Sequence, residues 1–483
     1  MESIDLKGGS YTAKSLIAGC QRCVNLFPEA NQDTAPTPFT YYQRYGLKSI
    51  SAAIGLNARG SYRATNGELY EVIGTNVYFT DSTFTRTLLG TIAAGSTPVC
   101  MVDNGQDGGV LVIVDGTVNG YVVTLSGHAF STISDAAFYG STRVEYMDTY
   151  FVFNRPGTTQ WYLSPQHWNG TDPFDALDIA DKVGGADNLA VAACNAGNVQ
   201  LIGLLTTEIW YNAANVDFVF ARVPSVFIEH GTPAAYSVAQ NDVGTYFLSQ
   251  DDDGGCIFLK IVGYEAKRFS THAIEAEIST YSTVADCIAQ TYQIEGHAFV
   301  KFSFPTADKT WVWDESQGLW HEETWIDSNG EEHMHRGVFT AYAYTLNVMQ
   351  DWQDGTLYQQ DVNTFIDETT VPSPIVWRRG FPHMLNAGKR VSYSKFIANM
   401  QAGAAPGLLT TDEPLISMRY SDTRGYTWSD PVTTGIGSTG EYDRWPTYWQ
   451  LGMAQDRVFE IFWDAPYATA LMGAFVELEA AET

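Results

Sequence analysis

Short apolar runs, rich in aromatic and β-branched residues and separated by turn-forming residues, dominate the first 370 positions of the chain. One example is "DTYFVFNRPGTTQWYLS", Asp148 to Ser164, in which the runs 150–153 and 160–163 flank a Pro-Gly pair. Each run is too short for a helix and is bounded by helix-breaking residues. The pattern predicts a β-hairpin.

Similar hairpins recur at a loose period. They start at residues 67, 109, 148, 197, 244, 296 and 354, so that successive starts lie 42, 39, 49, 47, 52 and 58 residues apart. A period of about 40–50 residues leaves room for two further strands in each unit, which is typical of β-propeller blades. We therefore predict a propeller over residues 51–370, with each hairpin as the inner pair of its blade. Six blades are favoured and seven are possible, because the last hairpin could complete the first blade.

Two segments fall outside the repeat. Residues 1–50 are rich in Pro, Gln and Asn and are interpreted as an extended arm. Residues 372–483 alternate polar and apolar positions in runs such as "LISMRYS" and "RVFEIFW". This alternation is typical of half-buried antiparallel strands and predicts a second, β-sandwich-like domain. The expected fold is therefore all-β, and no stretch shows convincing helical periodicity.

The composition is that of a globular, turn-rich protein, with 45% hydrophobic residues, 13% aromatic residues and 43 glycines. A chain of 483 residues exceeds the size of one ordinary core, which favours a repeat architecture or several domains. The longest apolar runs, such as Val110 to Val114, are far shorter than the roughly 20 residues of a membrane helix. We expect no membrane insertion, and the first residues show no signal-peptide pattern.

The chain is strongly acidic, with 55 Asp and Glu against 27 Lys and Arg and a formal net charge of −28. Residues 371–483 hold 9 basic and 12 acidic residues, a net of −3, so the first 370 residues carry the remaining −25. Proteins that grip DNA through its phosphates carry the opposite balance. The charge argues against a DNA clamp, and solvation of the surface is the ordinary interpretation of such an acidic excess.

Metal and redox chemistry is weakly indicated. Cys20 and Cys23 are the one close pair among six cysteines, whereas a structural zinc site usually needs two such pairs; we expect reduced, mostly buried thiols. Asp251 to Asp253 match no calcium-binding loop, so a solvated turn is the better interpretation. His333 and His335 would share one strand face, which suits a metal, but no third ligand is indicated. No cofactor and no catalytic, cofactor-binding or metal-binding residue is predicted.

Glycan chemistry is also weakly indicated. A glycosidase would need paired carboxylates in a pocket, or a Tyr nucleophile with clustered arginines, and the carboxylates here mostly flank turns. The stretch "SDTRGYTWS", Ser421 to Ser429, is similar to the Asp-box turn of sialidases and other propellers, with Thr423 at the Asp position. In those proteins the box is a structural hairpin. It favours β-architecture over enzymatic activity, and an enzyme is not predicted.

A series of unusual phrases follows in a fixed order. After Asp148 to Ser164 come "DPFDALDIA", "TEIWYN", "FIEHGTPAAYSVAQND", "KRFSTHAIEAEI" and "GSTGEYDRWPTYWQLGMAQDRVFEIFW". This series resembles the packaged-DNA stabilisation proteins of short-tailed phages, the tail accessory or hub (nozzle) proteins found in phages of Salmonella. The resemblance covers roughly residues 20–480. The departures, Thr423 in place of Asp and His230 after Glu229, concern local turns and not the role.

The resemblance implies a structural virion protein that is assembled in the host cytoplasm and located in the tail. It implies a homo-hexameric ring below the portal and its adaptor, which prolongs the DNA channel and helps to retain packaged DNA. It also implies contacts with a needle and with tailspikes or fibres, while DNA passes through without specific binding. Two alternatives stay open: a propeller glycan hydrolase or lectin of the sialidase type, and a cytosolic scaffold propeller.

Two further expectations concern where these functions lie. Residues 1–50 and 372–483 are expected to pack into one docking platform that faces the adaptor, so that deletion of 372–483 would abolish attachment and leave a soluble propeller. The acidic lumen is expected to draw on loops at blade edges, such as Asp251 to Asp253 and Glu331 to Glu332.

Overall fold

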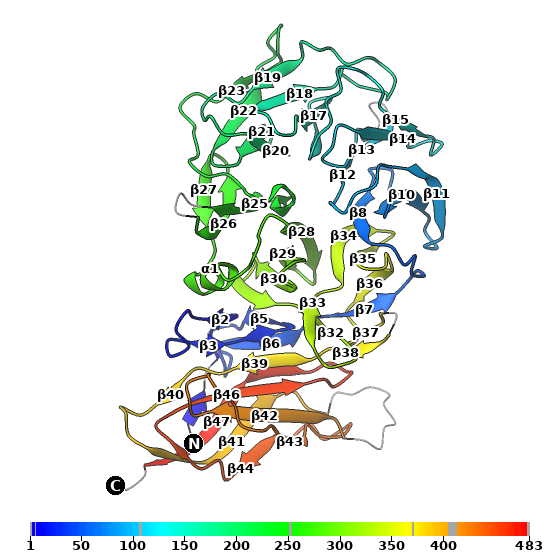
Figure 1. Ribbon diagram of the computed structural model, residues 1–483. Coiled ribbons are helices and arrows are strands. Elements are labelled where there is room, and N and C mark those ends of the chain that lie inside the picture. The colour runs from blue at the N-terminus through cyan, green and yellow to red at the C-terminus, as the bar shows by residue number, and fades with distance from the viewer. Residues whose placement is uncertain are drawn as a thin grey trace.

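The protein combines a β-propeller with a β-sandwich, joined through strands of the N-terminal segment (Figure 1). The computed structural model describes residues 2–4, 6–105, 109–250, 254–369, 371–403 and 413–480. Within these ranges the one α-helix is α1 (His272–Ile278), which the sequence analysis did not predict because seven residues show too little periodicity. No helix in the described ranges is long and apolar enough to cross a membrane.

Six blades follow one another along the chain, each a four-stranded antiparallel meander. This is the number favoured from the sequence. The first three are β8 (Ala58–Arg63), β9 (Leu69–Ile73), β10 (Asn76–Thr80), β11 (Arg86–Thr91); β12 (Cys100–Asp103), β13 (Val110–Val114), β14 (Gly120–Thr124), β15 (Phe130–Thr132); β16 (Val144–Met147), β17 (Tyr150–Asn154), β18 (Gln160–Leu163), β19 (Ile179–Asp181). The next three are β20 (Leu189–Asn195), β21 (Asn198–Gly203), β22 (Thr207–Asn212), β23 (Phe220–Arg222); β24 (Ala239–Gln240), β25 (Thr245–Gln250), β26 (Cys256–Val262), β27 (Glu265–Arg268); β28 (Ile288–Ile294), β29 (His297–Phe304), β30 (Lys309–Asp314), β31 (Leu319–Glu322).

A composite seventh sheet closes the ring between the sixth blade and the first. Its strands β34 (Gly337–Ala343), β35 (Leu346–Asp351) and β36 (Leu357–Asp361) follow the sixth blade. Its fourth strand, β7 (Gly46–Ser49), comes from the N-terminal segment and pairs antiparallel with β36. The inner strand β34 contacts both β28 and β8 and so links the last blade to the first, while β7, from outside the propeller region, completes the sheet.

The predicted hairpin at 148–164 is the middle of its blade, so its assignment as the inner pair was wrong. The strands β17 and β18 are second and third, and the inner strand is β16, which pairs with β17. Asp148 and Thr149 connect β16 to β17 with positive φ values of 48° and 73°, as in the two-residue turns that join tightly paired strands. The polar-apolar alternation of β16 gave no strong hydrophobic signal in the sequence.

Apolar clusters between neighbouring blades form the propeller core. One cluster combines Val112 and Val122 of the second blade with Phe151 and Phe153 of the third and with Trp168 of the following loop. Burial of one such side chain contributes about 1.5–3 kcal/mol. The aromatic runs recur because each blade needs a neighbour on both faces to cover its apolar side chains.

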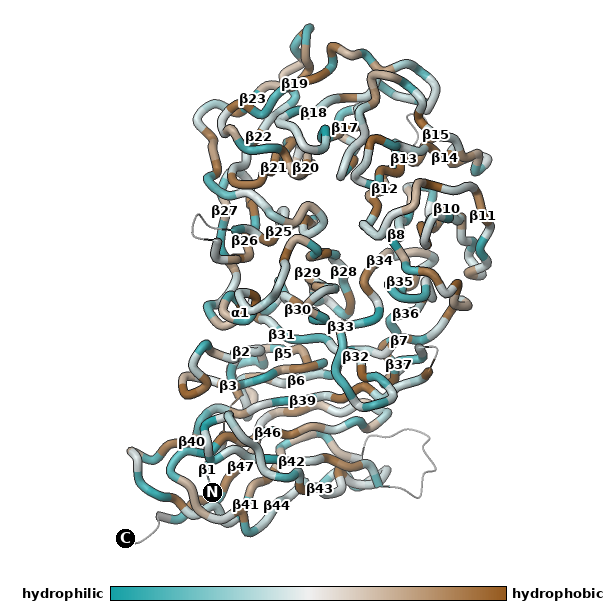
Figure 2. Tube along the Cα trace, viewed as in Figure 1, coloured by the Kyte–Doolittle hydropathy of each residue, from teal (hydrophilic) through white to brown (hydrophobic). Residues whose placement is uncertain are grey.

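The sandwich is formed by two sheets around one shared core, and the N-terminal segment contributes to both. Buried and partly exposed residues alternate along its long strand β41, and apolar and polar stretches alternate along the sandwich strands in Figure 2. The first sheet contains β44 (Thr447–Trp449), β41 (Val391–Met400), β47 (Ala470–Ala480), β6 (Phe39–Gln43) and β5 (Leu26–Ala30), with β1 (Glu2–Ile4) and β45 (Met453–Ala454) at its sides. The second contains β4 (Cys23–Val24), β39 (Trp377–Gly380), β46 (Asp456–Trp463), β42 (Leu415–Ser421) and β43 (Val432–Gly435), with β40 (Met384–Leu385) on β46.

Candidate functional site at the propeller–sandwich junction

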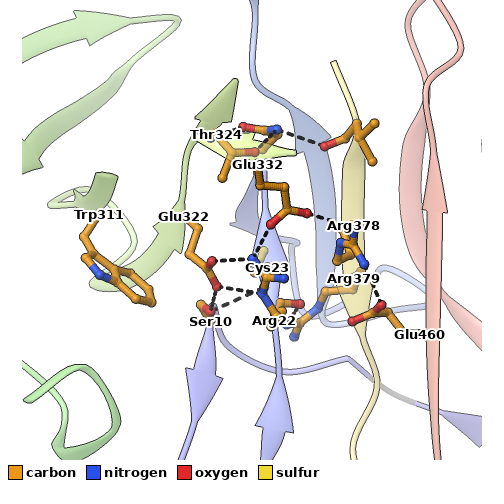
Figure 3. Close-up of polar contacts among 12 residues, drawn as sticks. Ser10, Arg22, Cys23, Trp311, Glu322, Thr324, Glu332, Arg378, Arg379 and Glu460 are labelled. Carbon is orange, nitrogen blue, oxygen red and sulfur yellow. Dashed lines mark hydrogen bonds and ion pairs between the residues drawn. The ribbon is translucent and has the colours of Figure 1, made fainter. Parts of the chain in front are cut away.

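One continuous sheet crosses from the sixth blade into the sandwich. Its joint is β4, which pairs parallel with β31 at Glu322 and Val24 and antiparallel with β39 at Val24 and Arg378. Because β4 has two residues, its backbone hydrogen bonds provide few contacts across the junction. The side chains shown in Figure 3 supply the rest.

Charges of alternating sign run along this joint. The Arg22 guanidinium lies 2.8 Å from the Glu322 carboxylate and 2.9 Å from that of Glu332. Arg378 in turn lies 2.8 Å from Glu332 and 2.9 Å from Glu460, so the row links the propeller, the arm and the sandwich (Figure 3). Burial alone would raise the pKa of Glu332, but Arg22 and Arg378 lower it, which keeps the carboxylate charged.

A second, fully buried ion pair fastens the arm where it enters the propeller. Arg44 donates to both carboxylate oxygens of Asp367, at 3.0 and 2.6 Å, and both side chains are at most 2% exposed. The same guanidinium donates to Asn25 Oδ1 at 2.8 Å and to the Thr324 carbonyl at 2.9 Å. Removal of either charge would leave the other buried without a partner.

A third buried group lies in the sixth blade. Lys301 Nζ lies 2.6 Å from Glu323, with His335 Nδ1 at 3.1 Å from the same nitrogen and His321 within 4.0 Å of the carboxylate. Burial lowers the pKa of Lys301, and it lowers the pKa of His321 to about 4. Burial alone would raise the pKa of Glu323, but Lys301 and the histidines lower it. Both histidines are therefore neutral in the folded protein near pH 7.

These shifts predict a loss of stability in mild acid. His321 binds a proton below about pH 6.5 in the unfolded chain but only near pH 4 in the folded chain, so the free energy of unfolding falls between these values. The carboxylate of Glu323 adds to the loss below its ordinary value of 4.5. Urea midpoints at pH 7.5, 6, 5 and 4 should fall steadily. His321→Asn should weaken the dependence of the urea midpoint on pH. His272→Asn, at a side chain that is 85% exposed, should leave this dependence unchanged. A midpoint constant from pH 7.5 to 4.5 would contradict this account.

The cavity at the centre of the propeller does not hold the paired carboxylates of a typical glycosidase among its described lining residues. It has a volume of about 500 Å³ and lies between the inner strands. Among its described lining residues the one carboxylate is Glu145, which lies 2.6 Å from Arg143. Arg143 also donates to the Val238 carbonyl and to Gln240, so its guanidinium is occupied by the protein itself. The second carboxylate of a carboxylate-pair mechanism has no counterpart among these lining residues, although Tyr62, Tyr236 and Arg63 are among them.

Cys20, His383 and Asp456 form a group similar to a Cys-His-Asp triad, which sequence reasoning missed because they lie far apart in the chain. Cys20 Sγ lies 3.8 Å from His383 Nε2, and His383 Nδ1 lies 2.8 Å from Asp456. However, Nε2 lies 2.8 Å from the Leu16 carbonyl oxygen and donates there, so it does not accept the thiol proton. Burial, Glu460 and Asp456 raise the pKa of Cys20 to about 11. The group fastens the arm to the sandwich.

The structure separates the other candidates named from the sequence. His333 lies 2.6 Å from Asp308, whereas His335 is buried beside Lys301, so the expected shared face was wrong: β33 (Glu332–Met334) ends before His335. Cys23 donates to the Leu26 carbonyl. Glu332 belongs to the junction row, and Glu331 is exposed. Asp251 to Asp253 lie outside the described residues. No group of three metal-ligating side chains occurs among the described residues.

The Asp-box-like turn is a structural element of the sandwich. Thr423 Oγ1 accepts from the Thr427 backbone N–H at 2.8 Å, and Ser421 Oγ accepts from Gly425 N–H at 2.8 Å. The Thr hydroxyl thus accepts a backbone hydrogen bond across the turn. Bidentate contact of Arg457 with Asp422, at 2.6 and 2.7 Å, holds the turn against the sheet.

An exposed aromatic face covers the outer side of the first sandwich sheet. Trp445, Trp449 and Met453 are 49%, 64% and 55% exposed. The Trp445 ring packs on Phe475 at 5.8 Å between centroids, and Lys395 lies over Trp449 at 5.1 Å. Exposed apolar surfaces that include tryptophan typically mark protein interfaces. We call this surface the aromatic face.

The ring of blades and the two-sheeted sandwich define an all-β protein, a β-propeller with an added C-terminal sandwich. Residues 4–365 match the model of the family described as "Bacteriophage P22 Gp10, beta-propeller", and the chain belongs to this family. The resemblance to packaged-DNA stabilisation proteins is thereby confirmed. A comparison with curated proteins gave no match.

Two solved structures match the chain at low similarity. A chain in "Crystal Structure of Mitotic Checkpoint Complex" is 10% identical with a TM-score of 0.43, covering 69% of this chain and 96% of its own. The WD40 domain of Neurospora crassa Pan2 is 7% identical with a TM-score of 0.41, covering 66% and 95%. At these values the likeness supports no conclusion about the fold or the function.

Proposed function

We propose that the protein is a hexameric tail hub, or nozzle, which extends the DNA channel below the portal and its adaptor and helps to retain packaged DNA. The observation that carries the proposal is membership of the P22 Gp10 family over most of the propeller. In this proposal the hub also carries a needle and tailspikes or fibres, assembles in the host cytoplasm and becomes part of the virion tail. Its role is structural and not enzymatic.

The sandwich, together with residues 1–50, serves as the docking platform in this proposal. Support comes from the strands that the arm places in both sandwich sheets and from the aromatic face on the outside of one of them. Residues 1–50 hold 5 basic and 4 acidic residues, a net of +1, and residues 371–483 hold a net of −3. The platform is therefore close to neutral, which suits a permanent protein interface.

The acidic propeller forms the channel wall in this proposal. With net charges of +1 and −3 outside it, residues 51–370 carry −26 of the total −28. Six copies of such a surface around a lumen repel the phosphates, so that the genome slides without adhering.

The purified protein should therefore show no retention of double-stranded DNA at moderate salt in a gel-shift experiment. Lys substitutions at exposed carboxylates that line the lumen, with Glu331 as the first candidate, should create binding that weakens as salt increases. Asp430→Lys, an exposed change in the sandwich, serves as the control and should leave DNA unbound. Tight DNA binding by the unmodified protein would contradict a repelling wall and indicate retention by gripping.

A further inference from the structure

A second cavity lies beside the centre of the propeller, between the sixth blade and the composite seventh sheet, and we call it the inter-blade cavity. Its volume is about 660 Å³, within the range of about 300–1,000 Å³ that is usual for small-molecule sites. The strands β28, β29, β34 and β35 line it, together with Asn241 and Asp242 in the turn after β24. In Figure 1, β28 and β34 lie side by side on the inner side of the ring, and the two strands are in contact.

Hydrogen bonds between neighbouring blades hold the walls of the inter-blade cavity in place. Thr291 Oγ1 donates to the Gln240 carbonyl at 2.9 Å, and Thr340 Oγ1 donates to the Thr291 carbonyl at 3.1 Å. Asn347 Nδ2 donates to the Gln293 carbonyl at 3.0 Å. These bonds link the fifth blade, the sixth blade and the seventh sheet around the cavity. A ligand would therefore bind with little cost for ordering the protein.

One part of the lining is apolar. Phe299, Val348 and Met349 contribute to it, and each is at most 3% exposed. Tyr342, in β34, is 61% exposed and lines both this cavity and the cavity at the centre of the propeller. An exposed aromatic ring in a concave site offers a flat apolar surface to the C–H groups of a ligand.

The polar part of the lining has hydrogen-bonding capacity that the protein does not use. Asn347 Oδ1 and the side-chain amide of Gln293 make no hydrogen bond within the described residues. The exposed carboxylate of Asp242 forms no ion pair within the same ranges. Amides donate and accept, and a carboxylate accepts, so that these groups together match the hydroxyl groups of a ligand.

The charges of the lining restrict the class of ligand. Asp242 is the one carboxylate among the described residues that line the inter-blade cavity, and none of them is Lys, Arg or His. An anionic ligand would meet a like charge and no opposite one, which disfavours it. The lining suits a neutral molecule that combines an apolar face with many hydroxyl groups.

We propose that the inter-blade cavity binds a neutral saccharide. The C–H face of a sugar ring packs on Tyr342, and its hydroxyl groups donate to Asp242 and to Asn347 Oδ1. The amide of Gln293 supplies a further donor and acceptor. This site adds ligand recognition to the proposed structural role of the hub, and it does not depend on the hexameric ring.

The site has room for more than one sugar unit. The inter-blade cavity adjoins the cavity of about 500 Å³ at the centre of the propeller, because Tyr342 and four further residues line both: Gln240, Thr291, Thr340 and Ala341. A saccharide chain that begins at Tyr342 therefore extends from one cavity into the other.

Saturation-transfer NMR with the full-length protein tests this assignment. The probes are the methyl glycosides of glucose, galactose, mannose and N-acetylglucosamine, together with maltotriose, mannotriose and tri-N-acetylchitotriose. At least one should receive saturation at a concentration of about 10 mM, which detects a Kd in the millimolar range. A trisaccharide should bind more tightly than the glycoside of its own sugar. Tyr342→Ala should weaken binding about fivefold, and Asp242→Asn about tenfold.

Two matched controls lie elsewhere in the propeller. Tyr264→Ala changes a 50% exposed side chain of the fifth blade, and Asp172→Asn changes an exposed carboxylate in the loop between β18 and β19. Both should retain the affinity of the unmodified protein. Circular dichroism and urea midpoints should be equal in all four variants, because the substituted side chains are exposed.

Saturation transfer to none of these sugars would overturn the proposal. Binding that Tyr342→Ala and Asp242→Asn leave unchanged would also overturn it, because the sugar would then occupy another site. Putrescine serves as a cationic probe, and binding of putrescine in the absence of any sugar binding would identify a cation site instead. Ring formation and adaptor attachment are measured separately and should be the same in Tyr342→Ala as in the unmodified protein.

Discussion

Substitution of Trp445 and Trp449 by Ser should abolish attachment of the protein to the adaptor while leaving the fold and the ring intact. Buried interface tryptophans commonly contribute about 2 kcal/mol or more each, which corresponds to roughly 30-fold in affinity for one residue. Both side chains are about half exposed or more in the isolated chain, so their removal costs the fold little. A pull-down with the adaptor, titrated over concentration, measures the loss.

Leu88→Ser is the control for this experiment, because Leu88 is 55% exposed on the first blade, away from the aromatic face. It should bind the adaptor as the unmodified protein does. Undiminished binding of the Trp445→Ser, Trp449→Ser variant would show that the aromatic face does not contact the adaptor.

Deletion of residues 372–483 is a poorer test of the docking platform than the sequence indicated. The strands β5 and β6 of the arm belong to the sandwich, and their residues Leu26 and Tyr41 are fully buried in its core. Truncation would expose these side chains together with the paired edge of β6. We now expect an aggregated product and not the soluble propeller predicted from the sequence.

Replacement of Arg44 by Met should produce the largest loss of stability in the protein. The guanidinium and the Asp367 carboxylate are at most 2% exposed, so the variant leaves a buried carboxylate without its partner. Loss of one member of a buried pair costs about 3–5 kcal/mol. Arg44 directly precedes Tyr45 and β7, so the composite seventh sheet should open first. Urea unfolding, followed by tryptophan fluorescence, measures the change.

A double-mutant cycle separates the charge effect from a packing effect. Arg44→Met combined with Asp367→Leu removes both charges, and it should recover part of the loss because no unpaired buried charge remains. Lys267→Met at an exposed pair, with side chains 55% and 76% exposed, should change stability by less than about 1 kcal/mol. If Arg44→Met lowers the free energy of unfolding by less than about 1 kcal/mol, the pair does not hold the propeller closed.

The propeller could be predicted from the sequence because its signal is local and repeated. The second and third strands of the blades are apolar on both faces, as in Phe151 to Phe153, and each hairpin turn is marked by Gly, Pro, Asn or Asp. The inner strands carry polar residues such as Glu145, which face the channel, so they were missed. The helix α1 was missed for a different reason, because it spans two turns only.

The junction could not be predicted, because its contacts join positions that are distant in sequence. Arg22 and Glu322, Arg44 and Asp367, and Cys20 and His383 are each separated by about 300 residues or more, and no period links them. The N-terminal segment carried Pro, Gln and Asn and was interpreted as an extended arm that packs with residues 372–483. Its short strands, which the C-terminal strand β47 extends by pairing with β6, were not predicted. Pairing of this kind depends on tertiary context and leaves no local pattern.

Electron microscopy of the purified protein mixed with its adaptor tests the central claim most directly. The account predicts closed rings with six-fold symmetry, attached to the adaptor through the sandwich end and leaving an open axial channel. Single propellers that neither close into rings nor bind the adaptor would contradict it.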